Sequence, residues 1–200
     1  MEFIHKVIYI NLDRRTDRRA EIEEELRRMD IRGERFSAIE HTPGIVGCGA
    51  SHLAILKRAR VEGWPNVLIL EDDFMFLVDK DTLENNLQTF FKSNTPYDVL
   101  MVGYNISNSE PFNETVSYAR SVQTTSGYIV HQSFYDILID HWEEALNNLI
   151  LTGMHWIYAL DQSWKTLQTS HTFFYFNTRI GKQRGSWSDL ANCYIDYPDS

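Results

Sequence analysis

Three consecutive carboxylates, Glu71, Asp72 and Asp73, follow the most apolar run of the sequence, residues 67–70. Neighbouring acids repel one another and raise one another's pKa unless a cation lies between them. Carboxylate oxygens suit Mg²⁺ or Mn²⁺, and such a cation would bridge to a substrate diphosphate. Because side chains alternate along an extended backbone, we expect Glu71 and Asp73 to point one way, as metal ligands, and Asp72 the other. The alternative is a solvated acidic turn that ends a strand.

A second charged group lies after the first strand-like run, where residues 11–19 read Asn-Leu-Asp-Arg-Arg-Thr-Asp-Arg-Arg. Arginine presents a planar fork of donors that suits a phosphate, and the start of the following helix adds its own positive end. Ligands of open α/β sheets bind at the carboxyl ends of the strands, so this turn and the acidic triplet would share one edge of the sheet. The alternative is a solvated charge run held by local Asp–Arg pairs.

The third group is Gly-Cys-Gly-Ala-Ser-His at residues 47–52. Glycine permits a close approach of the backbone, and Ser51 and His52 could supply hydrogen bonds at a helix start. We expect residues 42–49 to form a loop, with a helix from Ala50 that Gly63 and Pro65 stop. The alternative is a capped helix with a half-buried histidine.

Apolar periodicity predicts the elements that would position these residues. Strand-like runs are residues 6–10, 35–39, 67–70, 98–102, 117–122, 127–130 and 172–176, and further helical runs are 16–29, 81–91, 133–151 and 156–167. We expect residues 117–122 to pair with 127–130, residues 103–114 to form a loop, and the tail from 177 to be irregular. Strand and helix alternate in the first half, which favours an α/β fold with a mixed, mostly parallel sheet flanked by helices, in a single domain of residues 1–200.

Composition limits the class of partner. Hydrophobic residues make up 43% and charged residues 24% of the chain, and its net charge of −9 argues against general nucleic-acid binding. We find no apolar run near the roughly 20 residues of a membrane span and no signal-peptide core at the start. We therefore expect a soluble, cytoplasmic protein with no integral membrane segment, whose Cys48 and Cys193 are reduced thiols.

The three motifs, taken in order, resemble one family. Residues 8–19 (Ile-Tyr-Ile-Asn-Leu-Asp-Arg-Arg-Thr-Asp-Arg-Arg), residues 47–52 and residues 68–73 (Leu-Ile-Leu-Glu-Asp-Asp) are similar to glycosyltransferase family 25, the lipooligosaccharide-type and procollagen-type galactosyltransferases. Residues 125–130 and 183–189 resemble further segments of that family. The resemblance implies a GT-A-type, Rossmann-like fold, a UDP-sugar donor, Mn²⁺ (or Mg²⁺) held by the acidic triplet, and inversion at the anomeric carbon.

The same resemblance implies a nucleotide-sugar site that draws on all three motifs. Its expected members are Asn11, Leu12, Arg15, Arg18, Ser51, His52, Glu71 and Asp72. The first four would line the nucleotide pocket, and the serine and histidine would face the donor. The triplet begins with Glu where this fold usually has Asp-x-Asp, so which two carboxylates ligate the metal stays open. The sugar would be a hexose, galactose or glucose, and the acceptor a hydroxyl of a glycan or glycoprotein, as in lipopolysaccharide biosynthesis.

Inverting transfer needs a general base that takes the proton of the acceptor hydroxyl. Asp161 is the first candidate, because neighbouring aromatic residues such as Trp156 and Trp164 could raise its pKa by desolvation. Asp189 is the second candidate. For each aspartate the alternative is a structural role, in a helix or in a surface loop. Trp156 and Trp187 could stack on sugars.

Two other functions remain open from the sequence. The first is another Mg²⁺ enzyme that acts on phosphate esters, although a covalent phosphatase would need an aspartate where Glu71 stands. The second is a non-catalytic module that binds a nucleotide-sugar or a glycan. A transferase would slowly release UDP from its donor with Mn²⁺, whereas a binding module would not.

Overall fold

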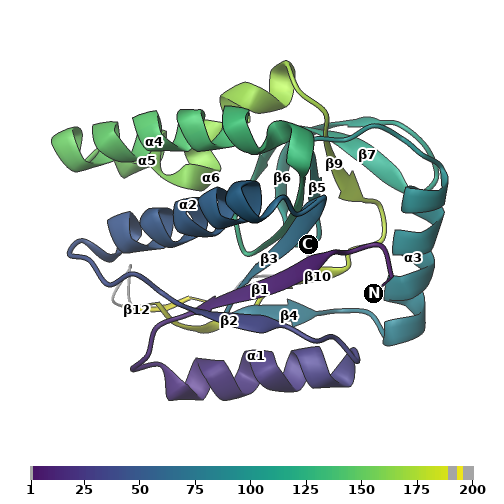
Figure 1. Ribbon diagram of the computed structural model, residues 1–200, viewed down its shortest axis with the longest axis horizontal. Helices are drawn as coiled ribbons and strands as arrows, with labels where there is room; N and C mark the ends of the chain where they lie inside the picture. The colour runs from purple at the N-terminus through teal and green to yellow at the C-terminus, as the bar shows by residue number, and fades with distance from the viewer. Residues whose placement is uncertain (1, 189–192, 196–200) are drawn as a thin grey trace.

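The computed structural model describes residues 2–188 and 193–195, and it shows one large sheet with helices on both faces (Figure 1). The strands are β1 Lys6–Asn11, β2 Glu34–Ser37, β3 Asn66–Glu71, β4 Phe74–Phe76, β5 Val99–Met101, β6 Asn105–Pro111, β7 Val116–Gln123, β8 Gly127–His131, β9 Phe173–Phe176, β10 Gly181–Gln183, β11 Ser186–Ser188 and β12 Cys193–Ile195. The helices are α1 Thr16–Arg28, α2 Gly44–Glu62, α3 Lys80–Lys92, α4 Tyr135–Thr152, α5 His155–Tyr158 and α6 Leu160–Ser163, with 3₁₀ turns η1 Gln132–Phe134 and η2 Trp164–Thr169.

The main sheet has eight strands in the order β2-β1-β3-β8-β5-β9-β7-β6. β1 is parallel to both β2 and β3, and β5 is parallel to β9. β8 runs antiparallel to β3 and β5, and β7 runs antiparallel to β9 and β6. All the strands of the sheet except β7 and β8 therefore point the same way. The predicted α/β class, with a mixed, mostly parallel sheet flanked by helices in a single domain, is confirmed.

Each face of the sheet is covered by its own apolar core. In β3, Val67 and Ile69 pack in the core that α2 and α4 share, whereas Leu68 and Leu70 pack in the core that α1 and α3 share. A strand with both faces covered needs apolar residues without alternation, which is why residues 67–70 are all aliphatic. Figure 1 shows α2 and α4 side by side over one face and α1 below the other.

The predicted loop at residues 42–49 is wrong, because α2 begins at Gly44 and runs through the glycine-rich motif. A Cβ at Gly47 would lie 2.3 Å from the Ile39 carbonyl oxygen, and one at Gly49 would lie 3.0 Å from Leu146 Cδ1. These glycines let the helix pack closely against its neighbours and do not mark a loop. The helix ends as expected at Gly63, which adopts a left-handed conformation with φ 67°.

The second half of the chain departs from the prediction in its strand pairing. β7 and β8 form, but they do not pair with each other, because β8 inserts between β3 and β5. The predicted loop at 103–114 contains β6, which pairs with β7, and the tail predicted to be irregular contains β10, which pairs with β4. The predicted helix at 156–167 is interrupted at Ala159, whose ψ of 148° leaves α5, α6 and η2 as separate turns.

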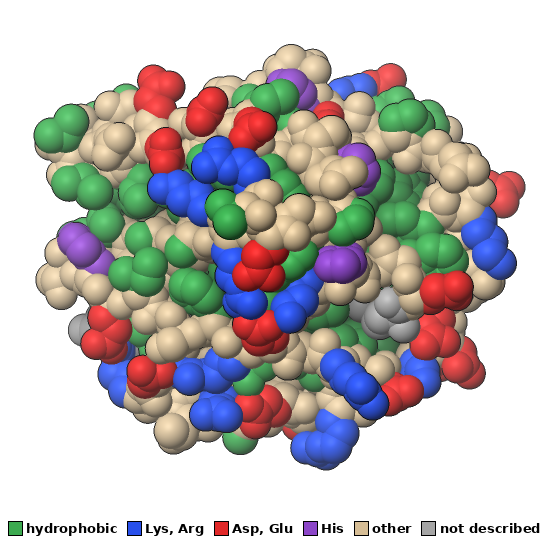
Figure 2. Space-filling model, in the orientation of Figure 1, with side chains coloured by type: hydrophobic (Ala, Val, Ile, Leu, Met, Phe, Trp, Pro, Cys, Tyr) green, Lys and Arg blue, Asp and Glu red, His purple; other side chains and the backbone are tan. Residues whose placement is uncertain are grey.

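The face of the molecule that Figure 2 shows carries charges of both signs. Its acidic and basic side chains lie interspersed, in a chain whose net charge is −9. Within the described residues, every helix is either too short or too polar to span a lipid bilayer.

Candidate functional site

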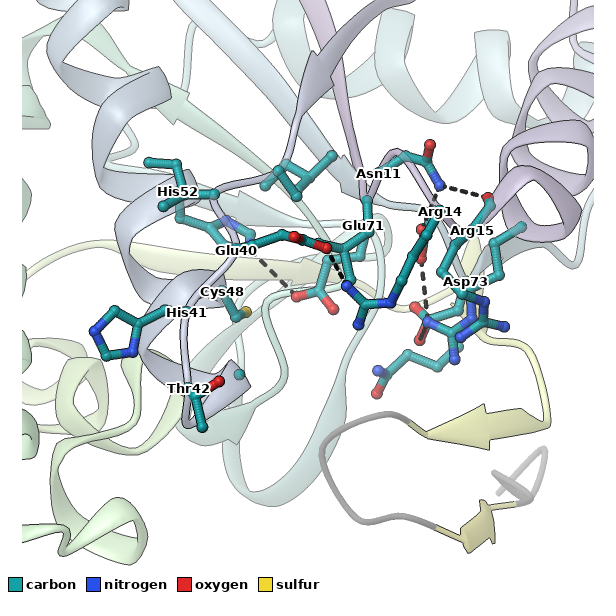
Figure 3. A pocket seen from close by; sticks show the side chains of 18 residues that line it. Asn11, Arg14, Arg15, Glu40, His41, Thr42, Cys48, His52, Glu71 and Asp73 are labelled. Carbon is teal, nitrogen blue, oxygen red and sulfur yellow. Dashed lines mark hydrogen bonds and ion pairs between the residues drawn. The ribbon is translucent and has the colours of Figure 1, made fainter.

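A cavity of about 710 Å³ opens at the edge of the sheet where β1 and β3 end (Figure 3). Parallel pairing aligns Ile10 of β1 with Glu71 of β3, so the residues that follow these strands meet at this edge. The start of α1, the segment between β2 and α2, the first turns of α2, and β10 complete its wall. The lining residues are Ile10, Asn11, Leu12, Arg14, Arg15, Arg18, Ala38, Ile39, Glu40, His41, Thr42, Gly44, Cys48, His52, Glu71, Asp72, Asp73 and Gln183.

The acidic triplet is anchored by the aromatic residue that follows it. Phe74 is 1% exposed, and a Cβ at Gly103, Gly127 or Gly181 would lie within 3.1 Å of its ring. The glycines therefore make room for the ring that holds the acidic turn against the sheet. β4 pairs with β10 directly after the turn, which brings Gln183 opposite Phe74 and into the cavity wall.

Asp72 and Asp73 share one cation, the guanidinium of Arg18. Arg18 Nη1 lies 3.1 Å from Asp72 Oδ1 and 3.3 Å from Asp73 Oδ2. Asn11 Nδ2 donates to Asp72 Oδ2 at 2.7 Å and to the Arg15 carbonyl oxygen at 3.0 Å. The arginine turn and the acidic triplet therefore lie on one edge of the sheet, as the sequence predicts, and they are in direct contact.

One arginine does not compensate the buried negative charge. Burial raises the pKa of Asp73, and so do the charges of Glu71 and Asp72; against the opposing effects of Arg18 and Gln183, the pKa reaches about 7. Burial also raises the pKa of Asp72, against hydrogen bonds from Asn11 and Arg18. Asp73 Oδ1 is buried and accepts no hydrogen bond from any residue that the structure describes. A buried carboxylate oxygen without a partner, next to two further acids, fits a divalent cation.

Glu71 lies on the other side of the acidic turn. Its Oε1 accepts a hydrogen bond from Thr125 Oγ1 at 2.7 Å and lies 3.3 Å from His52 Nε2. Burial opposes the charge of Glu71, but the contacts with His52 and Thr125 outweigh burial and lower its pKa. The predicted alternation therefore holds for Glu71 and Asp72 and is wrong for Asp73, which shares Arg18 with Asp72. The reason is that β3 ends at Glu71 and the next two residues form a turn.

Ser51 and His52 lie within α2 and not at its start, so they do not cap the helix. His52 is fully buried, lines the cavity, and places Nδ1 2.8 Å from Tyr128 Oη. Ser51 is also fully buried, donates to the Gly47 carbonyl oxygen and accepts from Ile39 N–H. The structure therefore brings His52 into the cavity wall and leaves Ser51 behind it, where it fixes the segment between β2 and α2.

Asp161 lies beside the cavity and is not one of its lining residues. Burial raises its pKa, as expected from the sequence, and the charge of Glu71 raises it further. Its Oδ2 accepts from Thr124 N–H and from Gln162 Nε2, both at 3.2 Å. Thr124 has a φ of 78° and donates through Oγ1 to Gln183 Oε1 at 3.0 Å, so a short polar chain joins Asp161 to the cavity wall.

The remaining sequence candidates are placed as follows. Trp156 is 62% exposed on α5, so it does not desolvate Asp161, whereas Trp164 is fully buried. Asp189 and the side chain of Trp187 lie outside the described residues. Sequence reasoning missed Cys48, which lines the cavity one helical turn before His52. The spacing of these two residues, four apart, was the signal available.

Asp73 predicts a pH dependence of stability for the metal-free chain. Its pKa of about 7 lies above the value of an exposed aspartate, so the folded state holds the proton more tightly than the unfolded state. The stability that this proton gives is complete at acid pH and is lost as pH rises through the folded-state pKa. Thermal unfolding with a chelator present should therefore give a lower melting temperature at about pH 8 than at about pH 5.

Two variants test which group causes this slope of melting temperature against pH. Asp73→Asn should flatten the slope, whereas Asp140→Asn, at an exposed position on α4, should keep it. An equal slope in Asp73→Asn and the original chain would assign the effect to other groups.

No family model and no curated protein matches the chain. Among solved structures, it is similar to A197 from STIV, with 13% identity over 98% of this chain and 96% of that one and a TM-score of 0.50. It is also similar to a glycosyltransferase involved in the glycosylation of the major capsid of PBCV-1, with 10% identity over 86% and 92% and a TM-score of 0.44. A mannose-1-phosphate geranyltransferase from Thermus thermophilus follows, with 13% identity over 92% and 60% and a TM-score of 0.41. At these identities the likeness concerns the fold.

Proposed function

We propose that the chain is a metal-dependent, inverting glycosyltransferase that transfers a hexose from a UDP-sugar to a hydroxyl of a glycan or glycoprotein acceptor. The observation that carries the proposal is the uncompensated acidic turn, in which Asp73 Oδ1 is buried without a partner among the described residues. Burying a carboxylate oxygen without a partner costs folding free energy unless a ligand binds it. Mn²⁺ or Mg²⁺, bound together with the donor diphosphate, would be that ligand for Asp73 Oδ1.

The proposed metal ligands are Asp73 and Glu71. Both line the cavity, but Asp73 turns toward Arg18 and Glu71 toward His52, so the cation would have to draw the two carboxylates together. Asp73 is the stronger candidate, because Glu71 Oε1 is already engaged by Thr125 and His52. Oxygen donors alone, from two carboxylates, suit Mn²⁺ or Mg²⁺ better than a softer cation. The bound cation would stabilise the charge that develops on the departing diphosphate.

The cavity supports a nucleotide-sugar as the ligand. Its volume of about 710 Å³ falls within the range of small-molecule sites. Arg14, Arg15 and Arg18 line it beside the first turn of α1, where the positive end of the helix favours an anion. Cationic side chains thus line the same cavity as the acidic turn, an arrangement that suits a metal-bound diphosphate.

The resemblance to glycosyltransferase family 25 supplies the finer part of the proposal. Asn11, Leu12, Arg15 and Arg18 would line the nucleotide pocket, with Glu71 and Asp72 as further members of the site. His52 would face the donor, and Ser51, the other residue that the resemblance assigns to the donor, lies behind the cavity wall. Asp161 is the proposed general base, because burial raises its pKa and the Thr124 N–H fixes its carboxylate. The chain would act as a soluble, cytoplasmic enzyme that does not have nucleic acid as a partner.

A thermal-shift screen of nucleotide-sugars with and without Mn²⁺ tests this function. A ligand that binds only the folded chain at a hundred times its Kd adds about 2.7 kcal/mol of stability. We expect UDP-galactose or UDP-glucose to raise the melting temperature only with Mn²⁺ present, and slow release of UDP to follow.

Three results would oppose the proposal. The first is no shift with any UDP-sugar. The second is binding without UDP release, which would indicate a binding module. The third is hydrolysis of simple phosphate esters with Mg²⁺, which would indicate a phosphatase.

A further inference from the structure

Cys48, His52 and Glu71 converge on one part of the cavity wall. One potential ligand atom from each residue, the thiol sulfur, an imidazole nitrogen and a carboxylate oxygen, lies within 4.8 Å of the other two. Cys48 and His52 stand four residues apart on α2 and so share one face of the helix, which packs against the end of β3. Figure 3 shows the three side chains directed toward one another.

The histidine of this cluster is held in a fixed orientation. His52 Nδ1 lies 2.8 Å from Tyr128 Oη, so the ring edge that carries Nε2 is directed at Glu71. The imidazole is fully buried. Although Nε2 lies 3.3 Å from Glu71 Oε1, it makes no hydrogen bond with any residue in the described part of the chain. A partner on the distal nitrogen is the usual support of a histidine that ligates a metal.

We propose that Cys48, His52 and Glu71 form a second metal site, selective for a thiophilic divalent cation such as Zn²⁺. Sulfur, imidazole and carboxylate are the donors that zinc prefers, whereas Mn²⁺ and Mg²⁺ prefer oxygen alone. All three residues line the cavity, so a fourth coordination position faces it. In a tetrahedral zinc site with bonds of about 2.0–2.3 Å, neighbouring ligand atoms lie roughly 3.5 Å apart. The three donor atoms here lie within 4.8 Å of one another, so each distance between them would shorten by at most about 1.3 Å on binding.

Binding at this site exchanges a proton for the metal. A cysteine ligates zinc as a thiolate, so the Cys48 thiol must give up its proton when the metal binds. Zinc would form the sulfur bond as the thiol proton leaves to solvent. Because Glu71 also belongs to the proposed donor site, Zn²⁺ bound here would oppose donor binding; only this consequence rests on the proposed function.

Cobalt is the probe that reports the sulfur bond directly, because thiolate-bound Co²⁺ absorbs in the near ultraviolet by charge transfer. The metal-free full chain is titrated with CoCl₂ and then with ZnCl₂. We expect a saturable charge-transfer band that Zn²⁺ displaces. Cys48→Ser should abolish the band, and His52→Gln should weaken Co²⁺ binding by at least about tenfold.

The chain offers a matched control in its other cysteine, since Cys193→Ser should keep the band in full. A wild-type chain without the band, a band that survives Cys48→Ser, or a band that requires Cys193 would overturn the proposal. If Cys48→Ser does not fold, alkylation of the unmutated chain decides instead. Zn²⁺ should protect Cys48 from iodoacetamide and Mg²⁺ should not, and equal labelling with both metals would overturn the site.

The two proposed metal sites can fail separately. Asp73→Ala should keep the cobalt band, because Asp73 is not a member of the thiol cluster. A chain that shows the band but never binds a UDP-sugar would contradict the proposed function and leave the zinc site standing. A chain that binds UDP-sugar with Mn²⁺ and shows no band would do the reverse.

Discussion

Asp73→Ala is expected to abolish Mn²⁺-dependent binding of the UDP-sugar donor while leaving the fold intact. Within the described acidic turn, Asp73 Oδ1 is the one buried carboxylate oxygen that lacks a partner. It is therefore the atom that we expect a cation to bind. Loss of a residue that only orients a metal ligand costs 10–100-fold in affinity, so removing the ligand itself should cost at least about a hundredfold. Titration calorimetry with UDP-galactose or UDP-glucose and Mn²⁺ measures this.

The same substitution should not destabilise the metal-free chain at neutral pH. Burial and the charge of Glu71 oppose ionisation of Asp73, so removing the carboxylate relieves a repulsion on the order of a few kcal/mol at most. Asp140→Ala, on the exposed side of α4, is the control and should bind donor as the original chain does. Unchanged donor affinity in a folded Asp73→Ala variant would contradict the metal assignment.

Asp161→Asn is expected to spare donor binding and to reduce turnover by about 10²–10⁴-fold, the usual contribution of a general base. The asparagine side chain is the same size and keeps an oxygen that can accept from Thr124 N–H, so the loop between β7 and β8 should hold its shape. Only the ability to take a proton is lost. Release of UDP at saturating donor, with and without a sugar acceptor, gives the turnover.

A structural role for Asp161 predicts a different result. If the carboxylate only supports the loop, Asp161→Asn should lower the melting temperature or the donor affinity and leave turnover near that of the original chain. Thr124→Ser keeps the hydroxyl that donates to Gln183 and serves as the matched control for a disturbed loop. Wild-type turnover in Asp161→Asn would remove it as the base.

The parts of the fold that the sequence predicts are those whose pattern is local. The aliphatic run before Glu71 can only be a strand covered on both faces, and the spacing of Ile22, Leu26 and Met29 predicts one buried face at α1. Strand pairing is not local. The insertion of β8 between β3 and β5 is decided by which faces pack together, and no pattern within β7 or β8 records it.

Glycine was the least reliable signal in this chain. Gly47 and Gly49 read as a loop, yet each lies inside α2, where the absence of a Cβ allows contact with Ile39 and Leu146. The reason for a glycine depends on the atoms around it, which the sequence does not show. The same misreading placed Ser51 and His52 at a helix start, although they lie about two turns after Gly44, where α2 begins.

The candidate site, too, has parts that a local pattern predicts and parts that depend on distant segments of the chain. The meeting of Asn11 with Asp72 could be predicted, because residues that follow two adjacent parallel strands share an edge. The turn that sends Asp73 to Arg18 could not, since strand alternation holds only while the backbone is extended. The approach of Gln183 depends on β10 pairing with β4, more than a hundred residues apart in the chain.

The most direct test is the anomalous scattering of manganese in crystals grown with UDP and MnCl₂. We expect a single strong manganese peak within coordination distance of an Asp73 carboxylate oxygen, with the UDP diphosphate on its far side and Arg18 close by. UDP bound without a manganese peak at the acidic turn, or three carboxylates that bind neither, would contradict the claim that a cation completes this turn.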